Sequence, residues 1–306
     1  MTDMIEIGFV GLGSMGAPMA ERLLDGNRVY GTNRTAAKAE ALVSKGMIWR
    51  DTPREVAEAA QVVVSMVTND AALASVTGGP DGILAGLRPG AVYIDMSTVS
   101  PRTSRALAAR VERIGATMLD APVSGSVPVA SAGGLTIMVG GPEKAYVAAG
   151  PVLHRLGSSV THVGENGQGL LLKLALNISL GAQMLAFSEG LLLAARSGIE
   201  PGLAAEVMAA SSIGSPMLKA RAALTLDPPA QAWFDMRLMH KDIRLALQAA
   251  RDADVPLPAA AVLDQILDQA AELGFAESDI AALYQVLGHT PARPMADGAS
   301  WQAQPA

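Results

Sequence analysis

The chain has 306 residues, 50% of them hydrophobic and only 17% charged, which suits about two folded domains and excludes an intrinsically disordered protein. The formal net charge of −6, with Lys and Arg scattered along the chain, excludes the basic surface of a nucleic-acid-binding protein. Cysteine is absent, which excludes a disulfide framework, a thiolate zinc site and a cysteine nucleophile.

The N-terminus has neither a basic segment nor a long apolar run, so we expect no signal peptide. The most apolar stretch, residues 170–195, contains Lys173, Asn177 and Glu189, which makes it too polar for a membrane span. We therefore expect a cytoplasmic protein that binds neither a membrane nor a nucleic acid.

The first half of the chain alternates short β-branched segments with segments of helical periodicity. Predicted strands cover residues 5–10, 28–32, 61–66, 91–95 and 117–120, with further strands at 135–139 and 160–163. Helical spacing appears between them at 17–24, 36–44 and 102–113. Because strands that alternate with helices predict a parallel sheet covered on both faces, we expect residues 1–165 to form a Rossmann-type, doubly wound α/β domain.

The strand pattern stops at Gly167. Predicted helices then cover residues 167–197, 201–211, 216–225, 237–253, 258–272 and 277–286. Residues 166–290 are thus predicted to form an all-helical C-terminal domain, joined to the α/β domain by the first, long helix. The Pro-, Ala- and Gln-rich residues 291–306 are predicted to be a flexible tail.

A glycine-rich turn, Gly11-Leu-Gly13-Ser14-Met15-Gly16, follows the first predicted strand and opens the first helix. In that context Gly11 permits a tight turn, Gly13 lets the backbone approach a pyrophosphate, and Gly16 lets the helix pack on the strand. The N-terminus of the helix then faces the phosphates. The turn therefore predicts a dinucleotide-binding site.

The end of the second predicted strand indicates which dinucleotide is bound. An NAD site uses an acidic side chain there to hold the ribose hydroxyls, but no acidic residue occurs between Asp25 and Glu40. Asn33, Arg34 and Thr35 offer hydrogen-bond donors instead, and the Arg34 guanidinium suits a 2′-phosphate. We therefore expect NADP, although an exposed arginine on an ordinary loop is the alternative.

Polar clusters follow two later strands, at the sheet edge where α/β proteins bind ligands. One runs from Asp95 to Pro101, and the other runs from Asp120 to Ser126 and ends in the turn Ser124-Gly125-Ser126. The hydroxyls and free backbone N–H groups of such a turn suit a small carboxylate. A β-turn that satisfies its own polar groups is the alternative.

Lys173 stands in a helical segment that is apolar on nearly every side, which is typical of a buried helix. Burial removes hydration from an ammonium, so a partner or a function has to compensate. Asn177, four residues later, projects from the same face. Together the two head groups could hold and protonate a carbonyl oxygen, whereas a lysine that snorkels into water is the alternative.

A charged pair, Lys241-Asp242, follows Phe234 on a predicted C-terminal helix. A solvated helix face is the more common explanation of such a pair. No metal site is predicted, because no ligand spacing on one helix occurs among the four histidines, His154, His162, His240 and His289.

Four segments in this order resemble the β-hydroxyacid dehydrogenases, a family that includes 3-hydroxyisobutyrate dehydrogenase and tartronate semialdehyde reductase. They are the motifs at Gly11–Ala20, Asp120–Gly125, Gly164–Asn177 and Lys241–Ile243. The resemblance covers nearly the whole chain up to about residue 290. The glyoxylate/succinic semialdehyde reductase branch is the most similar, because it shares the Ser-Gly-Ser turn where many relatives have Ser-Gly-Gly. The segments around Ser126–Ala130 and Trp233–His240 depart from it.

The resemblance implies an NADPH-dependent oxidoreductase that reduces a small aldehyde or keto acid to the hydroxy acid, and that forms homodimers or homotetramers. It implies that Lys173 is the proton donor, with Asn177 orienting it. The implied substrate contacts are Ser124, Gly125, Ser126, Thr98, Phe234 and Asp242. The implied cofactor contacts are Gly11, Gly13, Ser14, Met15, Gly16, Asn33, Arg34, Thr35, Met66, Val67, Thr98 and Lys241.

Two other functions are compatible with this architecture. Imine reductases share it but usually carry Asp or Tyr at the position of Lys173. A non-catalytic NADP-binding scaffold would typically lose the lysine. Because Lys173 is present, both alternatives rank below the reductase.

Overall fold

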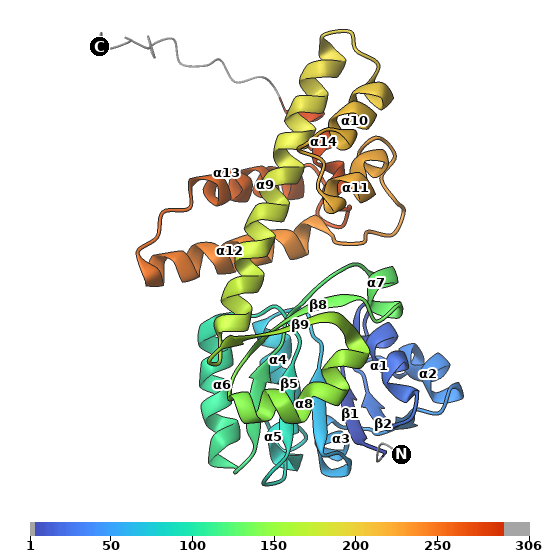
Figure 1. The fold of residues 1–306 in the computed structure, drawn as a ribbon, viewed down its shortest axis with the longest axis vertical. Helices are drawn as coiled ribbons and strands as arrows, with labels where there is room; N and C mark the ends of the chain where they lie inside the picture. Colours follow the sequence, from blue (N-terminus) through green and yellow to red (C-terminus); the bar gives the residue numbers. More distant parts are fainter. Residues whose placement is uncertain (1–3, 291–306) are drawn as a thin grey trace.

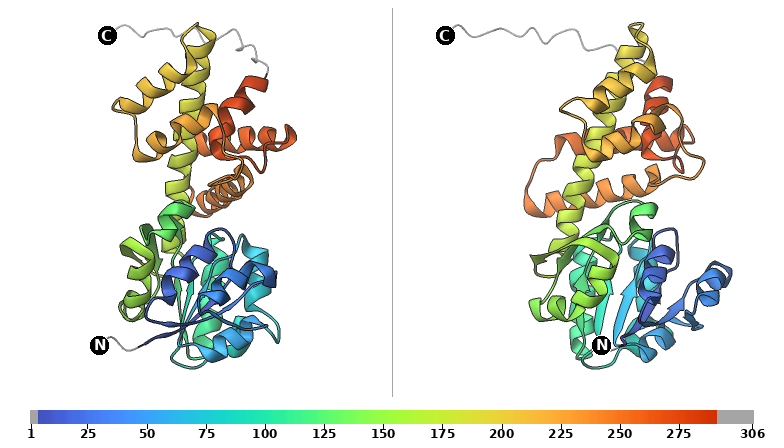
Figure 2. Two further views of the ribbon diagram at one scale, coloured as in Figure 1. Left: turned by 90° about the vertical axis from the view of Figure 1, so that its right-hand side faces the viewer. Right: turned by 45° about the vertical axis from the view of Figure 1, so that its right-hand side comes forward.

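The computed structural model describes residues 4–290, and the predicted tail at 291–306 lies outside this range. The described residues form a sheet-based N-terminal half and a helical C-terminal half, joined by the long helix α9 (Gln168–Arg196) (Figure 1). Two further views show the same arrangement, with α9 rising from one edge of the sheet through the helical half (Figure 2). The predicted fold class is confirmed.

Six parallel strands in the order β3-β2-β1-β4-β5-β6 form the main part of the sheet. Their bounds are β1 Glu6–Val10, β2 Arg28–Thr32, β3 Ile48–Trp49, β4 Val62–Ser65, β5 Val92–Asp95 and β6 Thr117–Asp120. The strands β2 and β3 are added on one side of β1, and β4, β5 and β6 are added on the other, so the strand order reverses between β1 and β4. Doubly wound sheets bind ligands at the carboxyl ends of the strands beside such a reversal.

The sheet continues with strands that break the predicted parallel pattern. β8 (Leu135–Gly140) pairs antiparallel with β6 and with the short β7 (Val123–Ser124), and β9 (Gly157–Gly164) pairs parallel with β8. The sheet is therefore predominantly parallel, as predicted, and the antiparallel β8 at this edge is a feature that the sequence did not predict. A short helix, α7 (Val127–Ser131), lies between β7 and β8, and it allows β8 to return antiparallel instead of crossing over.

Helices cover both faces of the sheet, and each face has its own hydrophobic core. One core includes buried residues of α1, α2 and α8, and the other includes buried residues of α3, α4, α5 and α6. The bounds are α1 Gly16–Leu24, η1 Ala36–Ala39, α2 Glu40–Ser44, α3 Pro53–Ala59, α4 Asp70–Thr77, α5 Ile83–Gly86, α6 Pro101–Arg113 and α8 Glu143–Leu156.

The helical half packs around α9 as a separate core. Its elements are α10 Pro201–Ala210, α11 Pro216–Leu226, α12 Met236–Ala253, α13 Pro258–Glu272, η2 Ile280–Ala282 and α14 Leu283–His289. The prediction of a single helix at 277–286 was wrong, because residues 277–279 are not helical and the 3₁₀ helix η2 precedes α14. There the buried Asp279 side chain accepts hydrogen bonds from the backbone N–H groups of Trp233 and Phe234, which pins the segment in a turn.

Helix α9 is also long and apolar enough to cross a membrane by length and composition. Its buried residues Met184, Leu185, Phe187 and Leu191, however, belong to the core formed with α10–α14. Packing within the helical half therefore accounts for part of its apolar character, as it does for other core helices. The predicted cytoplasmic location stays a prediction.

Candidate active site

The glycine-rich turn after β1 has the shape that a dinucleotide requires. Gly11 has φ +98°, and a Cβ there would lie 2.3 Å from the carbonyl oxygen of Met66. A Cβ on Gly16 would lie 1.9 Å from the Gly11 carbonyl oxygen. Gly13, in contrast, is exposed and faces open space, so no neighbouring residue explains its small size. The predicted approach of a phosphate to Gly13 stays a prediction, and the open space beside this residue leaves room for it.

The three residues after β2 have different surroundings. The Asn33 side chain is engaged within the protein: its Oδ1 accepts a hydrogen bond from the Leu12 N–H at 3.1 Å, and its Nδ2 donates to the Thr35 carbonyl at 3.1 Å. It therefore ties the glycine-rich turn to the end of β2. Arg34 and Thr35 are exposed beside it.

A buried carboxyl joins the loops after β4 and β5. Asp95 Oδ1 accepts from the hydroxyls of Ser65 and Ser97, both at 2.7 Å, and Ser97 Oγ in turn accepts from the Val67 N–H at 2.9 Å. Burial raises the pKa of Asp95 to about 6. Asp95 and Ser97 thus fix the loops that carry Met66, Val67 and Thr98, and their own side chains are not exposed to a ligand.

Lys173 lies on α9 in the interior, with an exposed fraction of 9%. Burial lowers the pKa of its ammonium to about 8; Asp242 opposes this effect, and Lys241 reinforces it. Asn177 Nδ2 donates to Asp242 Oδ2 at 2.6 Å, and the buried Asn177 Oδ1 has no hydrogen-bond partner among residues 4–290. Because Asn177 follows Lys173 by four residues, this oxygen lies on the same face of α9 as the Lys173 ammonium and can accept a hydrogen bond from it.

Lys241 connects the two halves of the molecule. Its ammonium pairs with Asp242 Oδ1 at 2.7 Å and donates a hydrogen bond to the carbonyl oxygen of Thr98, on the loop after β5. Two residues that the sequence predicted as cofactor contacts, Thr98 and Lys241, are therefore adjacent. Both Asp242 oxygens face partners within the protein, Asn177 and Lys241, and the predicted role of Asp242 as a substrate contact stays a prediction.

The Ser124-Gly125-Ser126 turn connects β7 to α7. Gly125 has φ +148°, and a Cβ there would lie 2.7 Å from Leu135 Cδ2, so glycine is required. Neither serine hydroxyl donates or accepts a hydrogen bond within residues 4–290, and both side chains are half-buried. The turn thus offers two unused hydroxyls at the carboxyl end of the sheet.

Phe234, the other predicted substrate contact, precedes α12. Its side chain packs against the core of the helical half, and Asp279 Oδ2 accepts a hydrogen bond from its backbone N–H at 3.0 Å. The predicted contact with substrate stays a prediction.

Comparison with known proteins identifies the family. The family model described as the NAD binding domain of 6-phosphogluconate dehydrogenase matches residues 6–164, and the model described as NAD-binding of NADP-dependent 3-hydroxyisobutyrate dehydrogenase matches residues 167–287. The chain is 35% identical over 288 residues to 2-(hydroxymethyl)glutarate dehydrogenase of Eubacterium barkeri, covering 94% of this chain and 96% of that protein. The chain belongs to the β-hydroxyacid dehydrogenase family.

Two further relatives agree with this membership. The chain is 32% identical over 284 residues to the chloroplastic glyoxylate/succinic semialdehyde reductase 2 of Arabidopsis thaliana, covering 92% of this chain and 79% of that protein. A solved structure described as Psf3 in complex with NADP+ and 2-OPP has a TM-score of 0.84 and 28% identity, covering 92% of this chain and 99% of that one. The protein is therefore an NAD(P)-dependent oxidoreductase of the hydroxyacid dehydrogenase type.

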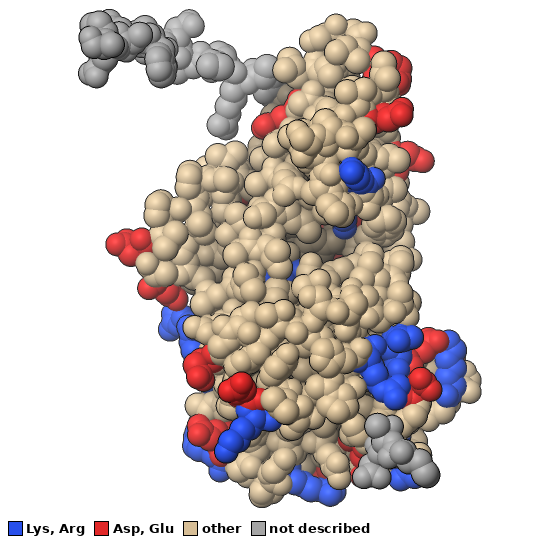
Figure 3. Space-filling view, in the orientation of Figure 1, with Lys and Arg blue, Asp and Glu red and all other residues tan. Residues whose placement is uncertain are grey.

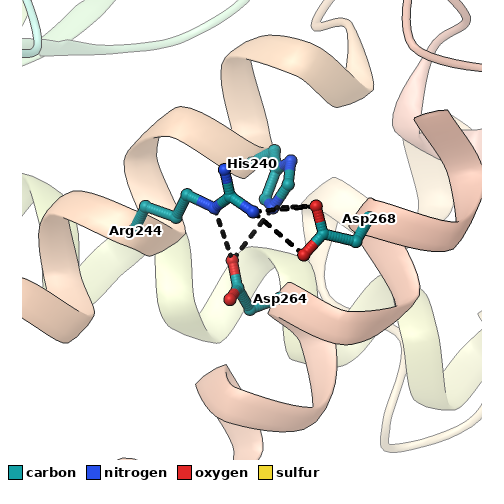
Figure 4. Close-up of polar contacts among 4 residues, drawn as sticks. All are labelled: His240, Arg244, Asp264 and Asp268. Atoms are coloured by element: carbon teal, nitrogen blue, oxygen red, sulfur yellow. Dashed lines mark hydrogen bonds and ion pairs between the residues drawn. The ribbon is translucent and has the colours of Figure 1, made fainter.

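The structure also assembles a cluster that the sequence did not predict in this β-hydroxyacid dehydrogenase family member. His240 on α12 lies 2.9 Å from Asp264 Oδ1 and 3.6 Å from Asp268 Oδ1, both on α13 (Figure 4). These three residues offer ligand atoms within 4.8 Å of one another, but the Arg244 guanidinium already pairs with both carboxylates. Spacing along one helix could not reveal this cluster, because its members come from two helices.

Proposed function

We propose that the protein is an NADPH-dependent reductase that converts a small aldehyde or keto acid, of the glyoxylate or succinic semialdehyde type, to the corresponding hydroxy acid. The observation that carries this proposal is the buried Lys173, whose pKa of about 8 suits proton transfer near neutral pH. Its helix begins at the sheet edge where the glycine-rich turn, Thr98 and Ser124 are located.

Lys173 acts as the general acid in this proposal. NADPH, when bound over the glycine-rich turn, would supply the hydride that reduces the carbonyl carbon. As the carbonyl oxygen gains negative charge, the Lys173 ammonium donates a proton to it, and the neutral amine accepts the proton in the reverse direction. Asp242 holds the Asn177 amide through Nδ2, which leaves Asn177 Oδ1 free to orient the ammonium.

We propose NADP as the cofactor because of the residues after β2. The absence of an acidic residue between Asp25 and Glu40 and the exposed Arg34 favour a 2′-phosphate over a free ribose hydroxyl. The second matching family model is described as that of an NADP-dependent enzyme, and the solved relative is described with NADP+. A clear preference for NADH would contradict this assignment.

We propose that the substrate carboxylate binds the Ser124-Gly125-Ser126 turn. Its two unused hydroxyls and its backbone N–H groups provide neutral donors, and Thr98 lies on the adjacent loop. The Arabidopsis relative is described as a reductase of glyoxylate and succinic semialdehyde, which supports a small acid with a free carboxylate.

We also infer that two or four copies assemble. Leu172, Leu176 and Leu193 lie on one side of α9 with exposed fractions of 43%, 39% and 71%, and a second copy would remove them from water. The face in Figure 3 likewise carries few charged atoms across its middle. Sedimentation velocity measures the assembly state, and a monomer at all concentrations would contradict this inference.

The decisive experiment follows the oxidation of NADPH, with NADH in parallel, against glyoxylate, succinic semialdehyde, methylmalonate semialdehyde and tartronate semialdehyde. Cyclic imines test the imine reductase alternative, and Lys173→Ala serves as the control. Turnover of one semialdehyde that Lys173→Ala loses by several orders of magnitude, with NADPH binding retained, is the expected result. If no acid is reduced but a cyclic imine is, the protein is an imine reductase and the proposal is wrong. If NADPH binds but no compound is turned over, the result favours the non-catalytic NADP-binding scaffold.

A further inference from the structure

Helix α9, which carries Lys173, begins without a capping side chain of its own. Its N-cap residue is Gly167, in the left-handed region with φ 91°, so the local sequence offers no side-chain acceptor. The first backbone N–H groups of a helix need acceptors, especially when they are buried. The first turn of α9 is buried at Gly167, Gly169 and Leu170.

The missing acceptor comes from the sheet. The carboxylate of Asp120, at the end of β6, accepts from the Gly167 N–H at 2.6 Å through Oδ1 and from the Leu170 N–H at 3.1 Å through Oδ2. Asn166 Nδ2 donates to the same Oδ1 at 3.4 Å. Asp120 therefore caps a helix that begins almost fifty residues later, and each of its two oxygens holds a different residue of the first turn.

The surroundings allow Asp120 little freedom to move. It is fully buried, and its backbone pairs with Asp95 on β5 and with Gly140 on β8. A Cβ on Gly169 would lie 2.9 Å from Asp120 Oδ2 and 2.5 Å from the Met138 carbonyl oxygen. Glycine at 169 thus lets the helix approach the carboxylate closely, and the contact fixes the position of α9 along its axis and its rotation.

We propose that Asp120 is a positioning residue for the reaction, which sets the depth and rotation of Lys173 by clamping the first turn of α9 to the end of β6. Lys173 follows Leu170 by three residues, a rise of about 4.5 Å, so little of the helix lies between clamp and ammonium. A displacement of about 1 Å in a reacting group can cost about 10²-fold in rate. The inference rests on the proposed role of Lys173 as proton donor.

The test replaces Asp120 with its isosteric amide. Asp120→Asn keeps one acceptor oxygen but presents an NH₂ group to the other backbone N–H, so one of the two clamps is lost. Competitive acylation of Lys173 across the neutral and alkaline range, followed by mass spectrometry of its peptide, measures the pKa of Lys173 without any turnover. The rate profile of semialdehyde reduction, NADPH affinity and the melting temperature are measured on the same protein.

The expected result is a fall in kcat of about 10²-fold, with NADPH binding retained and the pKa of Lys173 raised from about 8 toward the ordinary lysine value of 10.5. The direction is informative. Loss of a negative charge alone would lower the pKa of a nearby ammonium, whereas a loosened helix rehydrates the ammonium and raises it. An unchanged or lowered pKa, with only a lower melting temperature, would show that Asp120 is merely structural and would overturn the inference.

Two further variants keep the outcome decisive. Glu200→Gln is the matched control, because Glu200 accepts from two first-turn N–H groups of α10, those of Gly202 and Leu203. It should lower stability without changing the pKa of Lys173. If Asp120→Asn does not fold, Asn166→Ala removes the weaker hydrogen bond to Asp120 together with the one to the Met118 carbonyl oxygen, and it leaves both backbone clamps in place. It should shift the pKa of Lys173 in the same direction by less. Because acylation needs no substrate, inactivity of the wild type would reject the proposed function while leaving this inference to be judged separately.

Discussion

Helix α12 carries two charged clusters at adjacent positions, and they differ in almost every physical respect. The outer cluster joins His240 and Arg244 to two aspartates of α13 (Figure 4), and the Arg244 and Asp268 side chains are more than half exposed. The inner cluster joins Lys241 and Asp242 to α9 and to the loop after β5, and Asp242 is only 3% exposed.

The difference lies in how deeply the charges are buried. In the outer cluster one guanidinium, Arg244, pairs with two carboxylates, and water solvates the remaining charge, so the cluster links α12 to α13 at little cost. In the inner cluster two lysines share one carboxylate, whose oxygens face Asn177 and Lys241. Within residues 4–290 no carboxylate pairs with Lys173, and burial lowers the pKa of its ammonium to about 8.

The largest effect is expected for Lys173→Met, which replaces the lysine side chain with an uncharged, apolar one of similar length. We expect kcat to fall by about 10²–10⁴-fold, the usual contribution of a general acid. Stability should rise at neutral pH, on the order of 3 kcal/mol, because the native state no longer buries a charge whose pKa has been depressed from 10.5 to about 8. Turnover assays and chemical denaturation measure the two effects.

The stability gain of Lys173→Met should also depend on pH. Between about 8 and 10.5 the native lysine has lost its proton while the unfolded lysine retains it, so wild-type stability rises with pH in that interval. The advantage of the variant should therefore shrink as pH rises through this window. An advantage that stays constant across the window would mean that Lys173 is not buried as a charge, and the contrast between the clusters would fail.

The next test is the pH dependence of the wild-type reaction in both directions. Reduction needs the protonated Lys173, so its rate should fall about tenfold per pH unit once pH exceeds about 8. Oxidation of the hydroxy acid needs the neutral amine, so its rate should rise up to about pH 8 and then level off. Initial rates at saturating cofactor measure both profiles. Profiles that change in the same direction would assign the titration to another group.

The same contrast explains how far the sequence could predict this molecule. Strand-forming segments, the glycine-rich turn and the apolar helix around Lys173 are local patterns, and they predicted the fold class. The family was predicted from the resemblance of four motifs in order, and the family models confirm it. Lys241 and Asp242 were identified through the resemblance, but their contacts with Thr98 and Asn177 depend on α12 lying across α9. No spacing along the chain specifies that crossing.

Other parts could not be predicted, because several distant segments build them together. Asp120 appeared in the sequence only as the first residue of a substrate motif, and its role as a cap for α9 depends on a contact across 47 residues. The antiparallel β8 followed from a short helix that composition did not reveal. The outer cluster needs α13 beside α12, and the four histidines considered alone gave no indication of it.

The smallest expected effect comes from Arg244→Met in the outer cluster. The Arg244 side chain is 56% exposed, and exposed ion pairs contribute about 0.2–1 kcal/mol each, so the melting temperature should fall only slightly and mainly at low salt. Turnover and the pH profile should not change, although Arg244 lies only three residues from Lys241 on the same helix. A loss of turnover comparable to that of Lys173→Met would show that the two clusters act as one unit. If the effect stays confined to stability, neighbouring faces of one helix separate a charge network that holds the fold from one that serves the reaction.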